Sequence, residues 1–179
     1  MPGNKIRKYD TWHAMGQGAT TGSLVVTLEA LKEMHLTPED IQLIQNDTKT
    51  CPDTGMAGAS RSLYMDGNAT IIAANKLLAA MRKEDGTLRT YDEMKAEGIE
   101  TKYLGRYETN TTPGLCRLDP NTGIGDPTPA FTYCLNLAEV EVDTKTGKTT
   151  VLKFTCVDFV GRIGNIDAVN GQAYSGIMH

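Results

Sequence analysis

The sequence has few cysteines, and none of them forms a close pair. The four are widely spaced and show no Cys-x-x-Cys pattern: Cys51, Cys116, Cys134 and Cys156. Zinc and iron–sulfur sites are commonly built from such close pairs, so no metal site of that kind is expected within this chain. Isolated thiols are typical of buried cysteines in a reducing compartment, and we therefore predict a cytoplasmic location.

Long apolar runs and clusters of basic residues are also missing. The longest apolar stretch, 70–81, contains Asn75 and Lys76 and is too short to cross a bilayer. Residues 1–5 lead into polar and aromatic residues, unlike a secretory signal. The formal net charge is -4, with the two signs interspersed, so no basic face for nucleic acid is predicted. We expect neither a membrane nor a nucleic acid as a partner.

Several catalytic motifs are absent as well. The chain has no Gly-x-Ser-x-Gly element, and its three histidines show no recognisable partner spacing, which argues against a hydrolase. No phosphate loop with Gly-Lys-Ser/Thr occurs. Gly16-Gln17-Gly18 is followed by Gly22, and this spacing does not match the dinucleotide fingerprint.

What is present is enough apolar material for a folded core. The chain has 179 residues, of which 40% are hydrophobic and 22% charged, as in ordinary globular proteins of one domain or a domain and a half. Apolar periodicity predicts strands and helices in an α+β order. The predicted strands are 5–15, 41–44, 131–142 and 149–160, and the predicted helices are 23–34, 63–81, 91–98 and one from Val169.

The ends of these elements also follow from local signals. Thr21 or Ser23 is a suitable N-cap for the first helix, and Gly86 is a plausible stop for the second, within which Gly67 could cause a break. Residues 143–148 form a good hairpin connection. Residues 109–129, rich in Asn, Thr, Gly and Pro, are predicted to be a surface loop.

Three loops of small residues, 15–22, 46–62 and 161–165, each lead into a helix. Helix N-termini offer unpaired N–H groups and the positive end of the helix dipole, which suit phosphates and other electron-rich ligands. Any one of these loops is more simply a tight strand–helix turn. Three of them in one chain favour an anionic or heterocyclic ligand.

Three segments together resemble the molybdenum hydroxylases, the family of xanthine dehydrogenase and aldehyde oxidoreductase. The first is 14–22 with Met-Gly-Gln-Gly, the second runs from Asn46 to Ser62, and the third is 158–172 with its closing Gly171-Gln172. The order of the three is far more specific than any single motif. The resemblance implies the α+β fold of the family's second molybdenum-binding domain, a two-layer mixed sheet with packed helices, over residues 1–179.

The resemblance also implies a cofactor and the residues that hold it. The cofactor is molybdopterin with molybdenum, often as the cytosine dinucleotide. The first loop would wrap the pterin and its phosphate, the second would complete the cage, and the third would add a glutamine. By position these residues are Gly16, Gln17, Gly18, Ala19, Ser60, Arg61, Ser62 and Gln172. Family members hydroxylate aldehydes or aromatic heterocycles with oxygen from water.

The chain also departs from the family pattern. The catalytic glutamate of the family lies in a Gly-x-Gly-Glu element after the Gly-Gln segment, beyond residue 179, so no catalytic residue is assigned. Gly123-Ile124-Gly125-Asp126 precedes the hairpin, and Asp126 is given no catalytic role. Ile166 stands where the family commonly has Pro. We therefore expect no turnover by this polypeptide alone.

The last residues, 172–179, end inside an apolar helical pattern without a cap. This suggests a partial, truncated domain that works with the remaining segments or subunits of a molybdenum hydroxylase; a short terminal helix docked on the sheet is the alternative. Exposed apolar surface would favour a homo-oligomer. A binding or scaffold module without molybdenum is the second hypothesis, favoured by the missing glutamate. An unrelated nucleotide-binding protein is a third hypothesis, but it would need a phosphate loop.

Overall fold

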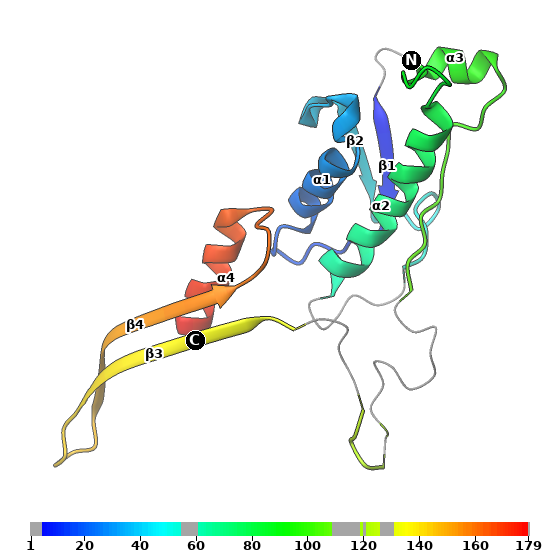
Figure 1. Cartoon of the computed structure of the whole chain (residues 1–179). Helices are drawn as coiled ribbons and strands as arrows, with labels where there is room; N and C mark the ends of the chain where they lie inside the picture. The colour runs from blue at the N-terminus through cyan, green and yellow to red at the C-terminus, as the bar shows by residue number, and fades with distance from the viewer. Residues whose placement is uncertain (1–4, 55–60, 109–118, 120, 126–130, 179) are drawn as a thin grey trace. The chain divides into compact units, whose positions relative to one another are not determined.

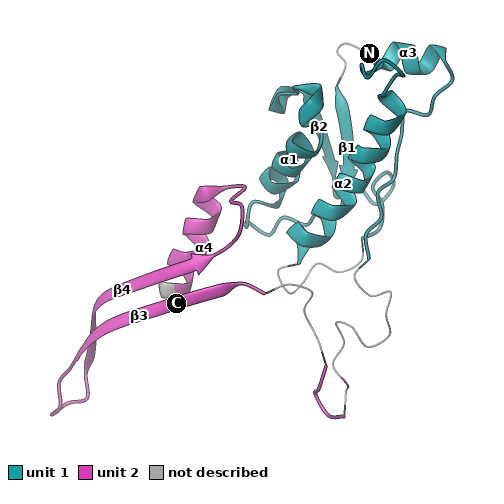
Figure 2. Cartoon of the chain, viewed as in Figure 1, with its two compact units in different colours: residues 1–111 teal, residues 112–179 magenta. Residues whose placement is uncertain are grey.

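The computed structural model describes residues 5–54, 61–108, 119, 121–125 and 131–178. The chain divides into two compact units, Met1–Thr111 and Thr112–His179 (Figure 2). Each unit has its own secondary structure and is described by itself.

The first unit alternates strands and helices along the chain (Figure 1). Its elements are β1 (Ile6–Asp10), α1 (Ala19–Ala30), β2 (Ile41–Gln45), α2 (Ser62–Met81) and α3 (Tyr91–Ala96), with short 3-10 turns at Lys32–Met34 and Pro38–Asp40. β1 and β2 pair in parallel from Ile6↔Ile41 to Asp10↔Gln45. Parallel neighbours need a crossover connection, which α1 provides. The carboxyl ends of both strands therefore lie at one edge, from which the chain leads into α1 and α2.

The core of the first unit lies where α1 and α2 pack together. Leu31, Ala74 and Leu78 are buried there, and partly buried apolar side chains surround them, including Ile6 from β1. Trp12 is also buried and lies under the start of α1, because a Cβ on Gly22 would come 3.4 Å from its ring.

The start of α1 differs from the sequence prediction. β1 ends at Asp10 instead of running to Met15, and α1 begins at Ala19, with Gly18 as its N-cap in the left-handed conformation. The predicted capping by Thr21 or Ser23 is therefore wrong. Ser23 is fully buried in the second turn of the helix, where its hydroxyl bonds to a strand.

α2 is continuous through Gly67, where a break was considered. Gly67 is buried, and a Cβ there would lie 4.0 Å from Val26 of α1, an ordinary van der Waals distance, so the packing of the two helices does not require a glycine at this position. The predicted stop at Gly86 is wrong. α2 ends at Met81, Arg82 turns into an extended conformation, and Gly86 closes the next turn through its N–H to Lys83 (3.0 Å).

The second unit is an antiparallel hairpin with one helix. β3 (Tyr133–Val142) pairs with β4 (Thr149–Phe159), and α4 spans Ile166–Met178. The predicted hairpin turn is confirmed, with the Asp143 carboxylate accepting the N–H of Lys145 at 2.8 Å. α4 begins three residues before the predicted Val169, because the Asn165 side chain accepts the N–H of Ala168 (3.1 Å) and supplies the N-cap.

The α+β class is confirmed. Among the described residues the strands form two sheets of two strands each, one parallel and one antiparallel. Of the predicted surface loop 109–129, only 119 and 121–125 lie within the described residues, and Asp126 lies outside them. No helix in the described ranges has the length and apolar character needed to cross a membrane.

Candidate functional site

The first candidate loop lies between β1 and α1 at the carboxyl edge of the parallel strands. Gly16 and Gly18 have positive φ values of 101° and 81°, which L side chains rarely adopt. A Cβ at either position would meet nothing within 4 Å, so the loop opens to solvent. α1 begins at Ala19, and its first-turn N–H groups have no acceptor within the helix by construction. The loop thus has the geometry of an anion site at a helix N-terminus.

Gln17 has a well-defined place within this loop. Its side-chain oxygen accepts the N–H of Met15 at 2.6 Å, and its side-chain nitrogen donates to the carbonyl of His13 at 2.8 Å. These two bonds brace the loop internally. The predicted contact of Gln17 with a cofactor stays a prediction.

The second candidate loop leads into α2. Ser60 lies outside the described residues. Arg61 is the exposed N-cap residue of α2, and its carbonyl accepts the N–H of Met65 at 2.9 Å. Ser62 is the first residue of the helix and is half-buried. Gly16–Ala19 and Arg61–Ser62 therefore share one arrangement, in which a parallel strand leads through a loop to a helix N-terminus.

A charged cluster that was not identified from the sequence lies beneath this edge. The Lys8 ammonium lies 2.8 Å from the Asp10 carboxylate and donates to the Ser23 hydroxyl at 2.7 Å. The Ser23 hydroxyl donates to Asp10 at 2.5 Å, and the Gln45 amide donates to the other Asp10 oxygen at 2.6 Å. Ile6, Lys8 and Asp10 are two residues apart along β1 and therefore share one strand face. Two charged residues on the same face as an apolar one were the sequence feature that indicated this cluster.

Asp66 of α2 is the second missed acidic residue. Burial and the negative charge of Asp10 raise the pKa of its carboxyl, while the charges of Lys8 and His13 act in the opposite direction. Asp66 is thus electrostatically coupled to the cluster.

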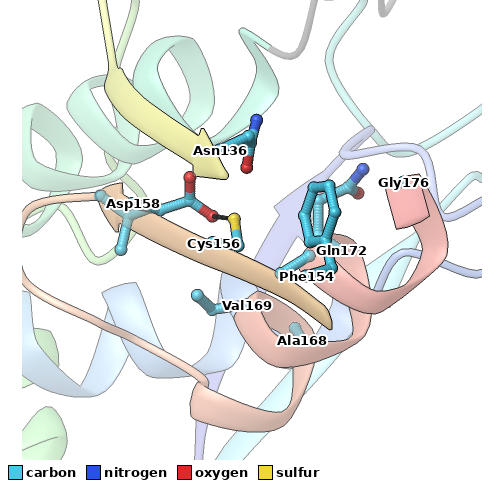
Figure 3. A pocket seen from close by; sticks show the side chains of 10 residues that line it. Asn136, Phe154, Cys156, Asp158, Ala168, Val169, Gln172 and Gly176 are labelled. Atoms are coloured by element: carbon cyan, nitrogen blue, oxygen red, sulfur yellow. Dashed lines mark hydrogen bonds between the residues drawn. The ribbon is translucent and has the colours of Figure 1, made fainter. Parts of the chain in front are cut away.

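The candidate residue from the third segment, Gln172, lies in the second unit. It is exposed on α4 and lines a cavity of about 420 Å³ between α4 and the hairpin. Figure 3 shows Asn136 from β3 and Cys156 and Asp158 from β4 around the same space. The Cys156 thiol donates to Asp158 at 3.2 Å, and this bond raises the pKa of Cys156. Cys156 was noted in the sequence only as an isolated thiol, and none of these hairpin residues was predicted to lie in a site; pairing across the strands brings them together.

Three comparisons place this geometry among known proteins. The chain matches the family model described as "Molybdopterin cofactor-binding domain" over residues 3–179. It is 38% identical over 172 residues to an aldehyde oxidoreductase of Megalodesulfovibrio gigas, covering 96% of this chain and 19% of that protein. It is 25% identical to the 6-hydroxypseudooxynicotine dehydrogenase complex subunit gamma of Paenarthrobacter nicotinovorans, covering 89% of this chain and 22% of that protein.

A solved structure agrees with these matches. The aldehyde oxidoreductase from Desulfovibrio desulfuricans superposes with a TM-score of 0.84 and 41% identity, over 96% of this chain and 18% of that one. The chain belongs to the molybdenum hydroxylase family, as a molybdopterin cofactor-binding domain. It spans between 18% and 22% of the length of these three relatives.

Proposed function

We propose that this chain holds the molybdenum cofactor of an oxidoreductase that hydroxylates aldehydes or aromatic heterocycles with oxygen from water. The observation that carries the proposal is the open glycine loop that ends directly at the N-terminus of α1. Backbone N–H groups of such a loop bind phosphate oxygens, and the glycines let a flat heterocycle approach the backbone.

The residues present fit this cofactor chemically. Gly16, Gln17, Gly18 and Ala19 would face the pterin and its phosphate, and Ser60, Arg61 and Ser62 would add hydroxyl and guanidinium donors from the second loop. Gln172 would add an amide from α4. The bound group would supply a two-electron redox centre, and the chain's own residues would bind and orient it. The cytosine dinucleotide form is part of the proposal, because a second phosphate and a base would occupy further donors.

The first test is metal and pterin analysis of the chain purified from a molybdenum-replete host. Elemental analysis and pterin fluorescence after oxidation should show molybdenum and pterin in stoichiometric amounts. The Gly18→Ala variant should lose most of both, because alanine is strained at φ 81° and the loop would change its path.

Gly147→Ala is the matched control. Gly147 has a φ of 75°, and nothing lies within 4 Å of a Cβ there, but it belongs to the hairpin turn of the second unit. This variant should suffer a similar backbone strain and keep its cofactor. Equal cofactor loss in both variants would contradict the assignment of the first loop.

The second hypothesis is a binding or scaffold module that keeps the fold without molybdenum. It is favoured by one observation: residues 1–179 contain no Gly-x-Gly-Glu element. Neither metal nor pterin in the purified chain would support this module. We also propose that the chain supplies binding groups for the cofactor and does not turn over substrate alone.

We further propose that the chain acts with other segments or subunits of a molybdenum hydroxylase in the cytoplasm. One matched relative is itself named as a subunit of a complex. Adding purified full-length partner subunits to the chain should restore substrate oxidation, and no recovery of activity would count against a split enzyme.

A further inference from the structure

The inward face of β1 is apolar at the start of the strand and charged toward its end. Ile6, Lys8 and Asp10 share this face because alternate strand residues point to the same side. Ile6 packs against the apolar core, whereas Asp10 is buried and the Lys8 side chain is only 11% exposed. The apolar core thus gives way to a buried ion pair at the edge that carries the glycine loop.

This ion pair joins three elements through one carboxylate. One Asp10 oxygen accepts the Ser23 hydroxyl of α1 at 2.5 Å and lies 2.8 Å from the Lys8 ammonium. The other accepts the Gln45 amide of β2 at 2.6 Å. Ser23 is fully buried and lies one turn after Ala19, so its bond connects the start of α1 to the ends of both strands.

The other end of the loop is also fixed. Thr11 donates its hydroxyl to the Pro52 carbonyl at 3.0 Å, and its oxygen lies 2.6 Å from the Thr54 hydroxyl. Trp12 is buried against Gly22. Between these anchors, residues 13–18 are all exposed. The charged cluster and Trp12 therefore determine where this exposed span begins and ends.

Stability alone does not account for such a cluster. Moving two charges out of water costs free energy that their attraction often fails to recover, and apolar residues of similar size are often as good or better. Charged groups and hydroxyls add hydrogen bonds of defined direction and length. A directed network beneath an open loop is suited to holding that loop in one position.

We propose that Asp10 is the positioning residue of the cofactor loop, acting through Ser23 on the first turns of α1. The inference rests on the proposed function, since the position of Gly16–Ala19 matters for cofactor binding only if this loop holds the cofactor. Asp66 of α2 is electrostatically coupled to Asp10 and Lys8 of the cluster.

Hydrogen exchange of the full-length chain tests the inference without depending on the cofactor. The reporter is the Gly22 N–H, which donates to the Gly18 carbonyl at 2.9 Å. Asp10→Ala and Ser23→Ala should each accelerate exchange at Gly22 by about tenfold or more, because each removes a bond to a charged group. Exchange at Gly22 in the double variant should be no faster than in the faster single variant, because both residues act on the loop through the bond between Ser23 and Asp10.

Leu78→Ala is the control, because Leu78 is buried in the core of the same unit away from the cluster. The melting temperature is measured for every variant, and exchange is compared at matched stability. Asp10→Asn keeps an acceptor for Ser23 and should recover much of the protection. If Asp10→Ala does not fold, Ser23→Ala and Asp10→Asn still give the comparison.

Two outcomes would overturn the inference: Gly22 exchange that rises equally in Leu78→Ala, or effects of the two cluster substitutions that simply add. Pterin content of the same proteins, from a molybdenum-replete host, separates this inference from the proposed function. A wild-type chain without pterin would defeat the proposed function, while the exchange data would still decide whether Asp10 positions the loop. Pterin lost from Ser23→Ala but kept by Leu78→Ala would support both.

Discussion

At the scale of single residues, Gly105 shows how closely a segment without secondary structure packs on a helix. A Cβ at this position would lie 1.9 Å from the Ala69 carbonyl oxygen and 2.8 Å from the Ala73 nitrogen of α2. Next to it, the Lys76 ammonium donates to the Leu104 carbonyl at 2.9 Å and holds the segment against the helix. Both groups that a side chain would meet are backbone atoms, which cannot move aside without moving α2.

Gly105→Ala should therefore destabilise the chain. Overpacking of this kind costs about 1–3 kcal/mol of unfolding free energy, and a clash with backbone belongs at the upper end. Urea denaturation measures the change. Gly171→Ala is the control, because nothing lies within 4 Å of a Cβ there and alanine is favoured in α4. Equal midpoints for Gly105→Ala and the wild type would contradict the close approach.

The glycine-rich loops could be predicted from the sequence, but the structural role of each glycine could not. Gly16 and Gly18 were identified from spacing, and their positive φ values agree with that prediction. Gly105 carries no such signal, because the need for a glycine arises from Ala69 and Ala73 of α2, which lie 36 and 32 positions earlier in the chain. Lys8 and Asp10 were missed because a strand of five residues was interpreted as a longer one, which hid the charged inward face.

At the scale of elements, the start of α3 is a complete capping box. The Thr90 hydroxyl accepts the Glu93 N–H at 3.2 Å, and the Glu93 carboxylate accepts the Thr90 N–H at 2.7 Å and bonds to Lys83, also at 2.7 Å. The bond from Lys83, followed by those from Thr90, lowers the pKa of Glu93 from 4.5 to about 2. A lowered pKa in the folded state means that ionised Glu93 favours folding.

Glu93→Gln should make the stability of the first unit less dependent on pH. In the wild type the contribution of Glu93 is fully present above pH 4.5 and is lost as the pH falls toward about 2. The variant should be less stable than the wild type at neutral pH, and the difference should shrink over that acidic range. Urea midpoints across a pH series measure it.

Thr90→Ala is the companion to this experiment. It removes the cap hydroxyl and leaves the carboxylate in place, so it should cost about 1 kcal/mol at neutral pH. A Glu93→Gln difference that stayed constant from neutral pH to pH 2 would show that the carboxylate charge is not what stabilises α3.

Apolar periodicity predicted which helices and strands form more accurately than it predicted where they begin. β2, α2, α3 and both hairpin strands lie close to their predicted ranges, because apolar spacing reports which face is buried. The starts of α1 and α4 were wrong, since Gly18 and Asn165 cap them before the apolar pattern begins. Apolar spacing cannot detect a cap that precedes the first apolar residue.

At the scale of the whole molecule, the hairpin of the second unit has one face on α4, and no helix among the described residues of this unit covers the other face. The cavity residues Asn136, Phe154, Cys156 and Asp158 share the first face. The opposite face carries apolar side chains that are each more than half exposed: Tyr133, Leu135, Leu137, Val157 and Phe159. A contiguous apolar surface of this kind favours association in water.

Leu135→Thr combined with Val157→Thr should reduce self-association of the purified chain. The two residues are paired across the strands, and threonine keeps a high strand propensity. Analytical ultracentrifugation over a concentration series should show larger species for the wild type and fewer for the double variant. Thr150→Ser on the same hairpin is the control. A wild-type chain that stays monomeric at every concentration would contradict this prediction.

The family and the α+β class were predicted from the sequence, whereas the division into two units was not. Motifs such as Met15-Gly16-Gln17-Gly18 are local and survive in a linear sequence. The boundary near Thr111 lies within a polar stretch that was predicted only as a surface loop, and nothing in its composition separates a loop within a domain from a connection between units.

The different pairing of the two sheets has a consequence for the order of folding. β3 and β4 are joined by the short turn 143–148, so their register forms between near neighbours, as in hairpins that form within microseconds. β1 pairs with β2 across 35 positions and only after α1 has folded back. Loop-closure entropy makes such non-local parallel pairing slower. In refolding, the hairpin of β3 and β4 should therefore form before the edge that carries the glycine loop, although the ribosome synthesises the hairpin later than that edge.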